Sequence, residues 1–354
     1  LGGVAASVLV AVPYVMSTRW LASAADAKVT GFGSFLGWGA LIALAWILLA
    51  SLAGLAVGGA ASLPARFLHI RARRSETALI VLGALVITMV LVGGLTRLTD
   101  SGLSITEWDL VMGTLPPLSA VDWQAVFAKY QETPEFRLVN STMTLEEFKV
   151  IFWWEWGHRF LGRITGLVWI GGFLGFLAAR KIPTGWMRRL LTVGVLIGVQ
   201  GAVGWWMVYS GLQGEMTDVA SYRLALHLGL AFVILGLIAW AVLLLGRREA
   251  DLIQARRLRE RALWGMGTGL LHFTFLQILI GALVAGIDAG RGYTDWPLMA
   301  GQVVPPDAFE ITPIWRNFFE NAGLVQFVHR IVGYLLALFA IGVLIRARKA
   351  GAAT

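Results

Sequence analysis

Long apolar runs separated by shorter polar segments are the dominant pattern along the chain. A helix that crosses the hydrocarbon core of a bilayer, ~30 Å thick, needs ~20 mostly apolar residues. Glycine and proline occur in the polar segments, as expected where one helix ends and the next begins. The pattern therefore predicts an all-α, polytopic membrane protein with about eight transmembrane helices, the first of them short. The predicted spans are 1–16, 34–60, 77–96, 149–178, 190–209, 222–245, 262–287 and 323–345.

Basic residues are concentrated in alternate loops of this arrangement. One set of segments holds 17 Lys or Arg, whereas the other set holds 8, together with 16 acidic residues. Because cytoplasmic loops are enriched in Lys and Arg, the first set is predicted to face the cytoplasm or the mitochondrial matrix, with both chain termini on that side. The net charge of +8 then reflects topology and indicates no binding of nucleic acid. The basic set is 66–74, 178–189, 246–261 and 346–349, and the other is 18–32, 97–149, 210–221 and 288–320.

The composition limits the chemistry that the chain can perform by itself. The sequence is 57% hydrophobic and only 14% charged, and it contains no Cys. Disulfides, thiolate metal sites and Cys nucleophiles are therefore excluded. Any redox reaction must be carried by a bound cofactor.

An internal repeat divides the chain. The segments "VGGLTRLTDSGLSITEWDLVMG" (92–113) and "IGALVAGIDAGRGYTDWPLMAG" (280–301) align without a gap. Each copy ends a span and opens a long loop, which leads into a span carrying His-Arg, in "EWGHRFLGR" (155–163) and "QFVHRIVGY" (326–334). Repeats of this kind are typical of homologous halves. We predict two homologous halves, 76–246 and 262–354, the second of them incomplete, preceded by two extra apolar segments within 1–75.

Histidines within the predicted spans suggest a haem. His158 and His227 lie about one to two turns below the outer ends of their spans, so their imidazoles could face each other at similar depth. In the usual arrangement of axial haem ligation, two helices each present an imidazole to the same iron. A single intramembrane His can equally be a hydrogen-bonded packing residue. For His158 and His329 ligation is favoured, because His, Arg and a glycine four residues later (Gly162 and Gly333) recur in both halves.

His272 is a weaker candidate ligand. It lies 16 residues before Asp288, which puts it over ~20 Å from the outer end of its span, whereas His329 lies near the outer end of its own. Depths that differ by about 10 Å do not suit one iron, so a packing role is favoured for His272.

A glutamate distinguishes the two halves. Glu155 lies three residues before His158, on the same helix face, and Gln326 takes the equivalent position before His329. A carboxylate in hydrocarbon is costly unless it is paired, protonated or functional, whereas Gln is its neutral isostere. The difference suggests one catalytic and one non-catalytic half. The alternative is that Glu155 only pairs with Arg159 at i+4.

Arginines at the same depth need anionic partners. Haem propionates would offer such partners in bidentate geometry. The candidates are Arg159, Arg163 and Arg330 within the spans, and Arg97 at the outer end of another.

Several motifs together resemble one family. They are "GGLTRLTDSGLSITEW", "WWEWGHRFLGR", "QGAVGWWMVYSGL", "RLALHLGLA", "GALVAGIDAGRGYTDWPLMAG" and "WRNFFENAGLVQFVHRIVGY". They resemble the haem A synthase family, in the mitochondrial and proteobacterial branch that lacks the loop cysteine pair, over roughly 77–346. The resemblance implies eight helices in two pseudo-symmetric four-helix halves, with a haem site in each. It also implies oxidation of the C8 methyl of haem O to a formyl group by successive hydroxylations, with oxygen from water, which supplies haem A to terminal oxidases.

The resemblance also implies roles for single residues. His158 and His227 would hold the substrate haem O, Glu155 would act near the methyl group, and His329 would be one ligand of a haem B cofactor. Expected partners are the lipid bilayer, an electron acceptor that the sequence does not name, haem O synthase, cytochrome oxidase assembly proteins and a second copy of the chain. The expected location is the bacterial cytoplasmic membrane or the mitochondrial inner membrane.

The chain departs from the family at its ends. The family's second half continues with two more helices, the last of which carries a His that pairs with the position of His329. Here the sequence stops at Thr354 and instead has the segments 1–16 and 34–60 before the family-like region. These two segments could fill the space of the missing pair, since both chain ends are predicted on one side, or the last two helices are simply absent.

Two other classes of function remain open. A dihaem b-type electron-transfer protein accounts for the histidines but not for the difference between Glu155 and Gln326. A non-catalytic haem carrier or assembly factor is favoured if loss of the fourth His has disabled the second site.

Overall fold

Six long apolar helices form most of the described structure. The computed structural model describes residues 74–109, 112–247, 249–258 and 261–350, and all six helices are long and apolar enough to cross a membrane. They confirm the all-helical membrane fold and six of the predicted spans. The other two, 1–16 and 34–60, and their proposed replacement of a helix pair, lie outside the described residues. The six are α4 (Arg74–Leu98), α7 (Leu145–Ala178), α8 (Met187–Gly211), α9 (Ser221–Gly246), α11 (Arg261–Gly286) and α13 (Ala322–Ala350).

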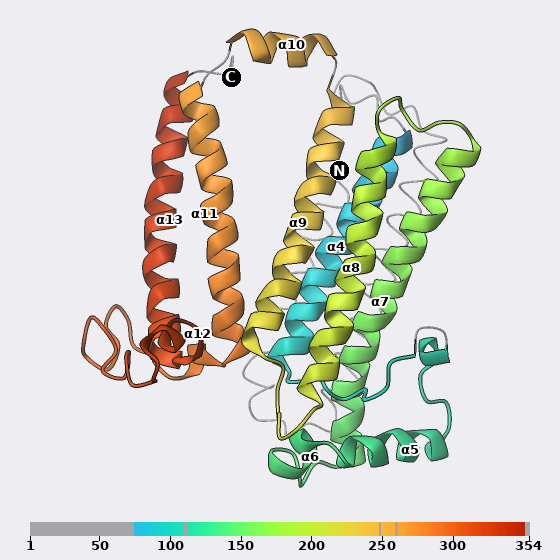
Figure 1. Ribbon diagram of the computed structural model, residues 1–354, viewed down its shortest axis with the longest axis vertical. Helices are drawn as coiled ribbons and strands as arrows, with labels where there is room; N and C mark the ends of the chain where they lie inside the picture. The colour runs from blue at the N-terminus through green and yellow to red at the C-terminus, as the bar shows by residue number, and fades with distance from the viewer. Residues whose placement is uncertain (1–73, 110–111, 248, 259–260, 351–354) are drawn as a thin grey trace, which may run out of the picture.

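The first four of these helices form a bundle. α4 packs against α7 and α9, and α8 packs against α9 and, more loosely, against α7. α7 and α9 therefore lie across the bundle from each other. α11 packs against α9 and α13, so that the last two helices stand beside the bundle as a pair (Figure 1). A short helix, α10 (Glu249–Leu258), connects α9 to α11 at one end of the molecule, here called the α10 end (Figure 1).

Aliphatic side chains fill the bundle toward the α10 end. Lipid tails are as apolar as these side chains, so the helices are held together by close packing more than by a hydrophobic driving force. Large apolar residues on the outer faces, such as Leu91, Leu167 and Trp240, remain exposed, as expected where a helix faces lipid. The buried cluster consists of Leu79, Leu82, Val86, Val193, Ile234, Ile238, Ala241 and Leu245.

The opposite end, here called the loop end, carries the long connections. α5 (Ala120–Gln131) and α6 (Pro134–Leu138) lie there beside the start of α7, and α12 (Asn317–Glu320) lies beside the start of α13 (Figure 1). α5 docks on α7 through aromatic rings, with Trp123 and Phe152 in edge contact at 5.0 Å between centroids. Capping fixes where α7 begins, because Thr144 accepts from the backbone N–H of Glu147 and Glu147 accepts from that of Thr144.

The two copies of the sequence repeat adopt the same local backbone. Asp100 follows the end of α4 by two residues and Asp288 follows the end of α11 by two, and both have φ of +49°. Asp tolerates this left-handed conformation better than most residues. The described residues thus contain four long helices of the first predicted half and two of the second, and the division at 76–246 and 262–354 stays a prediction.

The first prediction concerns the contact between α9 and α11. A Cβ atom at Gly286 would lie 2.7 Å from the Cα atom of Ser221, the first residue of α9. Overpacking of this kind costs ~1–3 kcal/mol, so Gly286→Ala should lower the thermal unfolding temperature in detergent by a few degrees. Gly236→Ala is the control, because no described atom lies within 4 Å of its added Cβ. Equal melting of the two variants would contradict this packing.

Candidate functional site

Each of three histidines lies against a glycine on a neighbouring helix. His158 on α7 faces Gly93 on α4, and His227 on α9 faces Gly204 on α8. Cβ atoms built on these glycines would lie 2.7 and 2.8 Å from the Cε1 atom of the facing imidazole. His329 on α13 stands in the same way against α11, 3.0 Å from a Cβ built on Gly281. A side chain at any of these glycines would displace the imidazole.

A glutamine accompanies two of these pairs, four residues before the glycine. Gln200 Nε2 lies 3.2 Å from both ring nitrogens of His227 and donates to the His227 backbone oxygen at 3.0 Å. Gln277 contacts His329 in the same way, at 3.1 and 3.3 Å from the ring nitrogens and 3.1 Å from the backbone oxygen. On α4 the equivalent position is Met89, which cannot donate a hydrogen bond.

These residues were missed by the sequence analysis, although the sequence contains a signal for them. The three helices share a Gln or Met followed four residues later by Gly, in "MVLVG" (89–93), "QGAVG" (200–204) and "QILIG" (277–281). Only the structure shows that this spacing faces a histidine.

The positions of His158 and His227 fit a planar ligand held between α7 and α9. The two imidazoles come from helices that lie across the bundle, and they are close enough to interact electrostatically. The Nδ1 atom of His158 is buried and has no hydrogen-bond partner among the described residues. Imidazole nitrogens from facing helices are the usual axial ligands of haem iron, so these residues fit the group that the sequence predicted.

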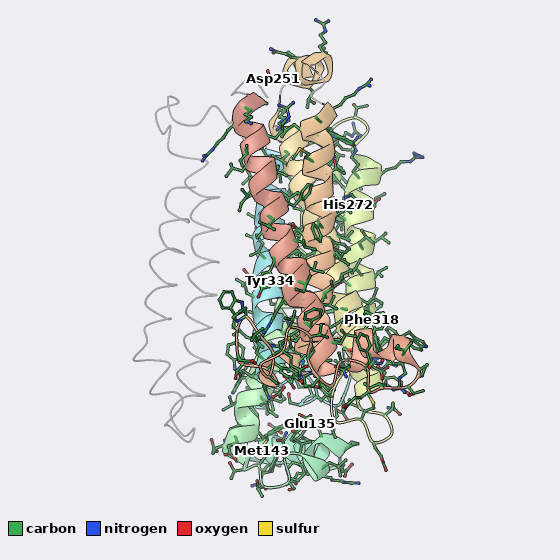
Figure 2. The ribbon with its side chains drawn as sticks, turned by 90° about the vertical axis from the view of Figure 1, so that its left-hand side faces the viewer. Glu135, Met143, Asp251, His272, Phe318 and Tyr334 are labelled. Carbon is green, nitrogen blue, oxygen red and sulfur yellow. The ribbon has the colours of Figure 1, made fainter. Side chains whose placement is uncertain are left out.

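His272 lies apart from these histidines. Its imidazole is exposed, and Nδ1 lies 2.8 Å from the backbone oxygen of Thr268 on its own helix. It is placed toward the α10 end, whereas Tyr334, close to His329 in sequence, lies nearer the loop end (Figure 2). The low rank of His272 as a haem ligand stays a prediction.

Glu155 is buried, and three groups hold its carboxylate. Only 3% of Glu155 is exposed. Its Oε2 atom accepts from the Ser104 hydroxyl at 2.7 Å and from the Ile105 backbone N–H at 2.8 Å. Its Oε1 atom accepts from Arg159 at 2.6 Å. The expected i+4 ion pair is therefore present, and charge-assisted hydrogen bonds fix the carboxylate in one orientation.

Gln326 is held differently from its counterpart. Its Nε2 atom donates to the backbone oxygen of Tyr293 at 2.8 Å. Its Oε1 atom is buried without a hydrogen-bond partner in the described part of the chain. The repeat position of Ser104 is Gly292, which has no hydroxyl to donate. The second half therefore lacks both the charge and one of the donors that surround Glu155.

The arginines predicted to bind propionates form hydrogen bonds between helices and loops. Arg159 donates to two backbone oxygens of the loop that follows α4. Arg330 donates to the two equivalent oxygens, 188 residues later, in the loop that follows α11, and also to the backbone oxygen of Leu298 at 3.3 Å. Arg163 makes one such bond further along the first loop. The bonds run from Arg159 to Ile105 (2.8 Å) and Glu107 (2.9 Å), from Arg330 to Tyr293 (2.8 Å) and Asp295 (2.9 Å), and from Arg163 to Asp109 (2.8 Å).

Arg97 joins the two predicted halves at the loop end. Its Nε atom donates to the backbone oxygen of Ala285, which is its own counterpart in the repeat, at 3.1 Å. Its guanidinium pairs with Asp100 and Asp218, each at 2.8 Å, and with Asp288 at 3.5 Å. Its side chain is 9% exposed. The partners seen here are carboxylates and a carbonyl, so its binding of a propionate stays a prediction.

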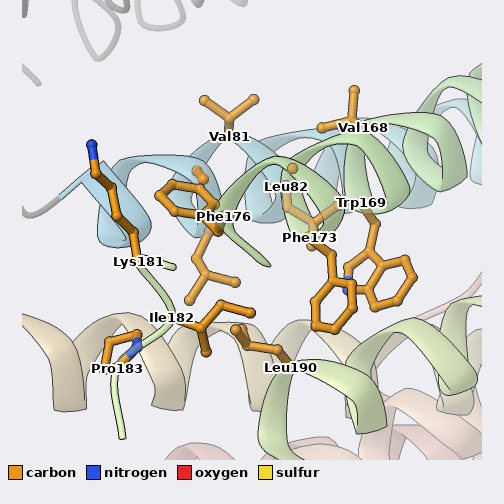
Figure 3. A pocket seen from close by; sticks show the side chains of 13 residues that line it. Val81, Leu82, Val168, Trp169, Phe173, Phe176, Lys181, Ile182, Pro183 and Leu190 are labelled. Atoms are coloured by element: carbon orange, nitrogen blue, oxygen red, sulfur yellow. The ribbon is translucent and has the colours of Figure 1, made fainter. Parts of the chain in front are cut away.

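An apolar cavity of about 190 Å³ lies between α4, α7 and the start of α8 (Figure 3). Its walls include Leu82, Trp169, Phe173 and Leu190, and Lys181 is the one charged residue in its lining. The cavity lies toward the α10 end of α7, away from Glu155. Because it offers few polar groups to orient a reacting atom, we do not place the chemistry there.

Comparisons with known proteins agree with the motifs. A family model described as "Cytochrome oxidase assembly protein" matches residues 76–354. A protein of Ruegeria pomeroyi named "Heme A synthase" is 68% identical over 273 residues, which cover 77% of this chain and 72% of that protein. The protein of the same name from Paracoccus denitrificans is 62% identical over 271 residues, which cover 77% and 71%.

A third relative carries the same name. The "Heme A synthase" of Dinoroseobacter shibae is 62% identical over 276 residues, covering 78% of this chain and 72% of that protein. No solved structure matches the chain. On the extent of the family match and of these identities, the chain belongs to this family of cytochrome oxidase assembly proteins.

Proposed function

We propose that this chain is a membrane oxidoreductase that converts haem O to haem A. The observation that carries the proposal is the identity of 57–68% with proteins named haem A synthase over most of the chain. The reaction oxidises one methyl group of haem O to a formyl group. The six apolar helices and the bacterial relatives make this a protein of the cytoplasmic membrane.

Within this function, His158 and His227 hold the iron of the substrate haem between α7 and α9. The electrostatic interaction between the two imidazoles and the buried Nδ1 atom of His158, which has no hydrogen-bond partner among the described residues, support this assignment. His329 would hold the iron of a haem B in the second half, supported by its glycine and glutamine neighbours. Haem iron would supply the one-electron chemistry of the reaction.

Glu155 acts as a fixed negative charge beside the reacting methyl group. Because Ser104, Ile105 and Arg159 hold its two oxygens, it does not need to reorient when charge develops nearby. Preorganised charge of this kind stabilises a transition state without reorganisation at the moment of reaction. A positive charge that develops on the carbon under oxidation is stabilised by the carboxylate, and water supplies the oxygen.

The remaining assignments extend this function. The electrons pass to an acceptor whose chemistry the structure does not identify. Haem O synthase, assembly proteins of cytochrome oxidase and a second copy of the chain are proposed partners. The loop end faces away from the cytoplasm, because the α10 segment and the end of α13 carry the excess of Lys and Arg.

The experiment that tests the function is expression in a host that makes haem O, followed by purification, haem extraction and identification by mass. Haem A, or its hydroxymethyl precursor, is the expected product. Haem B alone, with haem O available in the host, would contradict the proposal and favour an electron-transfer protein. Recovery of no haem at all would overturn the ligand assignments.

Glu155→Gln should reduce formation of haem A by about 10²-fold or more, because it removes the charge and keeps the shape. Haem binding should stay nearly unchanged, since the three histidines are untouched. Product formation and haem content are measured on the same preparations. Gln326→Glu is the matched control at the equivalent position and should not restore activity to Glu155→Gln. Normal turnover of Glu155→Gln would refute the role of the carboxylate.

Removal of single histidines should separate the two haem sites. His158→Ala or His227→Ala should lower the amount of haem O that co-purifies while haem B is retained. His329→Ala should lower the amount of haem B while haem O is retained. His272→Ala is the control and should leave both haems in place. The haems are again identified by mass after extraction. Equal loss of both haems from every variant would contradict separate sites.

A further inference from the structure

A second buried carboxyl group lies at the loop end, outside the membrane-spanning helices. Glu135 is on the short helix α6 and is 5% exposed. Its Oε1 atom receives a long hydrogen bond from Asn140, at 3.4 Å, and the hydroxyl of Tyr130 also interacts with the carboxyl group. Figure 2 shows Glu135 at the loop end, near Met143. The other oxygen, Oε2, is buried without a hydrogen-bond partner among the described residues.

The charges around Glu135 are mostly negative. Three carboxylates from three other elements lie close enough to act on it: Glu155 on α7, Asp100 after α4 and Asp218 between α8 and α9. Arg159 pairs with Glu155, and Arg97 pairs with the two aspartates. In the described ranges no Lys or Arg forms an ion pair with Glu135. Burial without a counter-charge disfavours the ionised form of a carboxyl group.

The protonation state of Glu135 follows from these surroundings. Burial first, and then the charge of Glu155, raise the pKa of the Glu135 carboxyl to about 8. Near neutral pH the group therefore holds a proton that it can release at a small cost. A group whose pKa lies near the working pH is suited to proton transfer. Glu155, in contrast, is fixed by three donors.

We propose that Glu135 relays protons between the site around Glu155 and the water at the loop end. The proposal rests on the proposed function, since the oxidation breaks C–H bonds and adds water, so that protons must leave while the electrons pass to the acceptor. In the relay the O–H bond of Glu135 breaks toward bulk water and re-forms with a proton from the site. At the end of each cycle Glu135 is protonated again, so that it undergoes no net change.

The test measures both the protonation of Glu135 and the rate of haem A formation. At pH 7 an ordinary carboxyl group is ionised, so the infrared C=O absorption of protonated carboxyl groups should include Glu135 in the wild-type protein and fade as the pH rises through about 8. Glu135→Gln should remove this absorption and slow haem A formation at least tenfold, while haem content and melting temperature stay unchanged. Gln imitates the protonated acid, so the packing around Tyr130 and Asn140 is kept.

Two further variants test whether the effects are specific to the carboxyl group of Glu135. Glu132→Gln is the control, because Glu132 is an exposed carboxyl group nearby on the same loop; it should change neither the absorption nor the rate. Glu135→Asp keeps the carboxyl group and should recover part of both. Asp218 is also partly buried and its pKa is raised, so an absorption that survives in Glu135→Gln and is lost in Asp218→Asn would overturn the proposal.

The remaining outcomes also decide the question. An absorption that is lost in Glu135→Gln with unchanged turnover would make Glu135 a structural acid and overturn the relay. Because the infrared measurement needs no substrate, it is independent of whether the chain makes haem A. Failure of the proposed function and failure of the relay are thereby distinguished.

Discussion

The absence of water in the bilayer core is the constraint on which this structure depends, because a polar group there needs a partner within the protein. The chain meets this requirement by bringing the loops after α4 and α11 back against the following helices. Arg159 and Arg330 donate to the backbone oxygens of those loops, and Glu155 accepts from one of them. The ionisable residues of "WWEWGHRFLGR" therefore fix the loop that covers the site as well as serving it.

The two copies of the sequence repeat make the same contacts, with small differences between them. Arg330 repeats the two backbone bonds of Arg159 at the same distances, 2.8 and 2.9 Å. The exchange of Glu155 for Gln326 removes the charge but keeps the shape of the side chain. Under the proposed function, a half that only holds a haem would not need a buried charge that an arginine and two further donors must neutralise. The charge of Glu155 would then be what specialises the first half.

The periodicity of the sequence was sufficient to predict the six described spans, because hydrocarbon thickness sets helix length and composition so strongly. The pairing of Glu155 with Arg159 was also predictable, since it is local along one helix. The contacts between helices could not be predicted from the sequence. That Gly93 faces His158, and that Arg97 bonds to Ala285, depends on helix rotation and on the approach of the two halves, which spacing alone does not specify. No pattern in the sequence predicted the burial of Glu135, because this burial comes from the packing of a short loop helix.

The two buried carboxyl groups near the loop end differ in what their partners allow. Ser104, Ile105 and Arg159 donate hydrogen bonds to the two oxygens of Glu155. Among the described residues nothing donates to Oε2 of Glu135, and burial together with the charge of Glu155 raises the pKa of the Glu135 carboxyl group. The charge of Glu155 therefore favours a proton on Glu135. In the proposed reaction, which develops positive charge and releases protons, Glu155 would stabilise the charge and Glu135 would carry the protons, so that the two tasks fall to separate side chains.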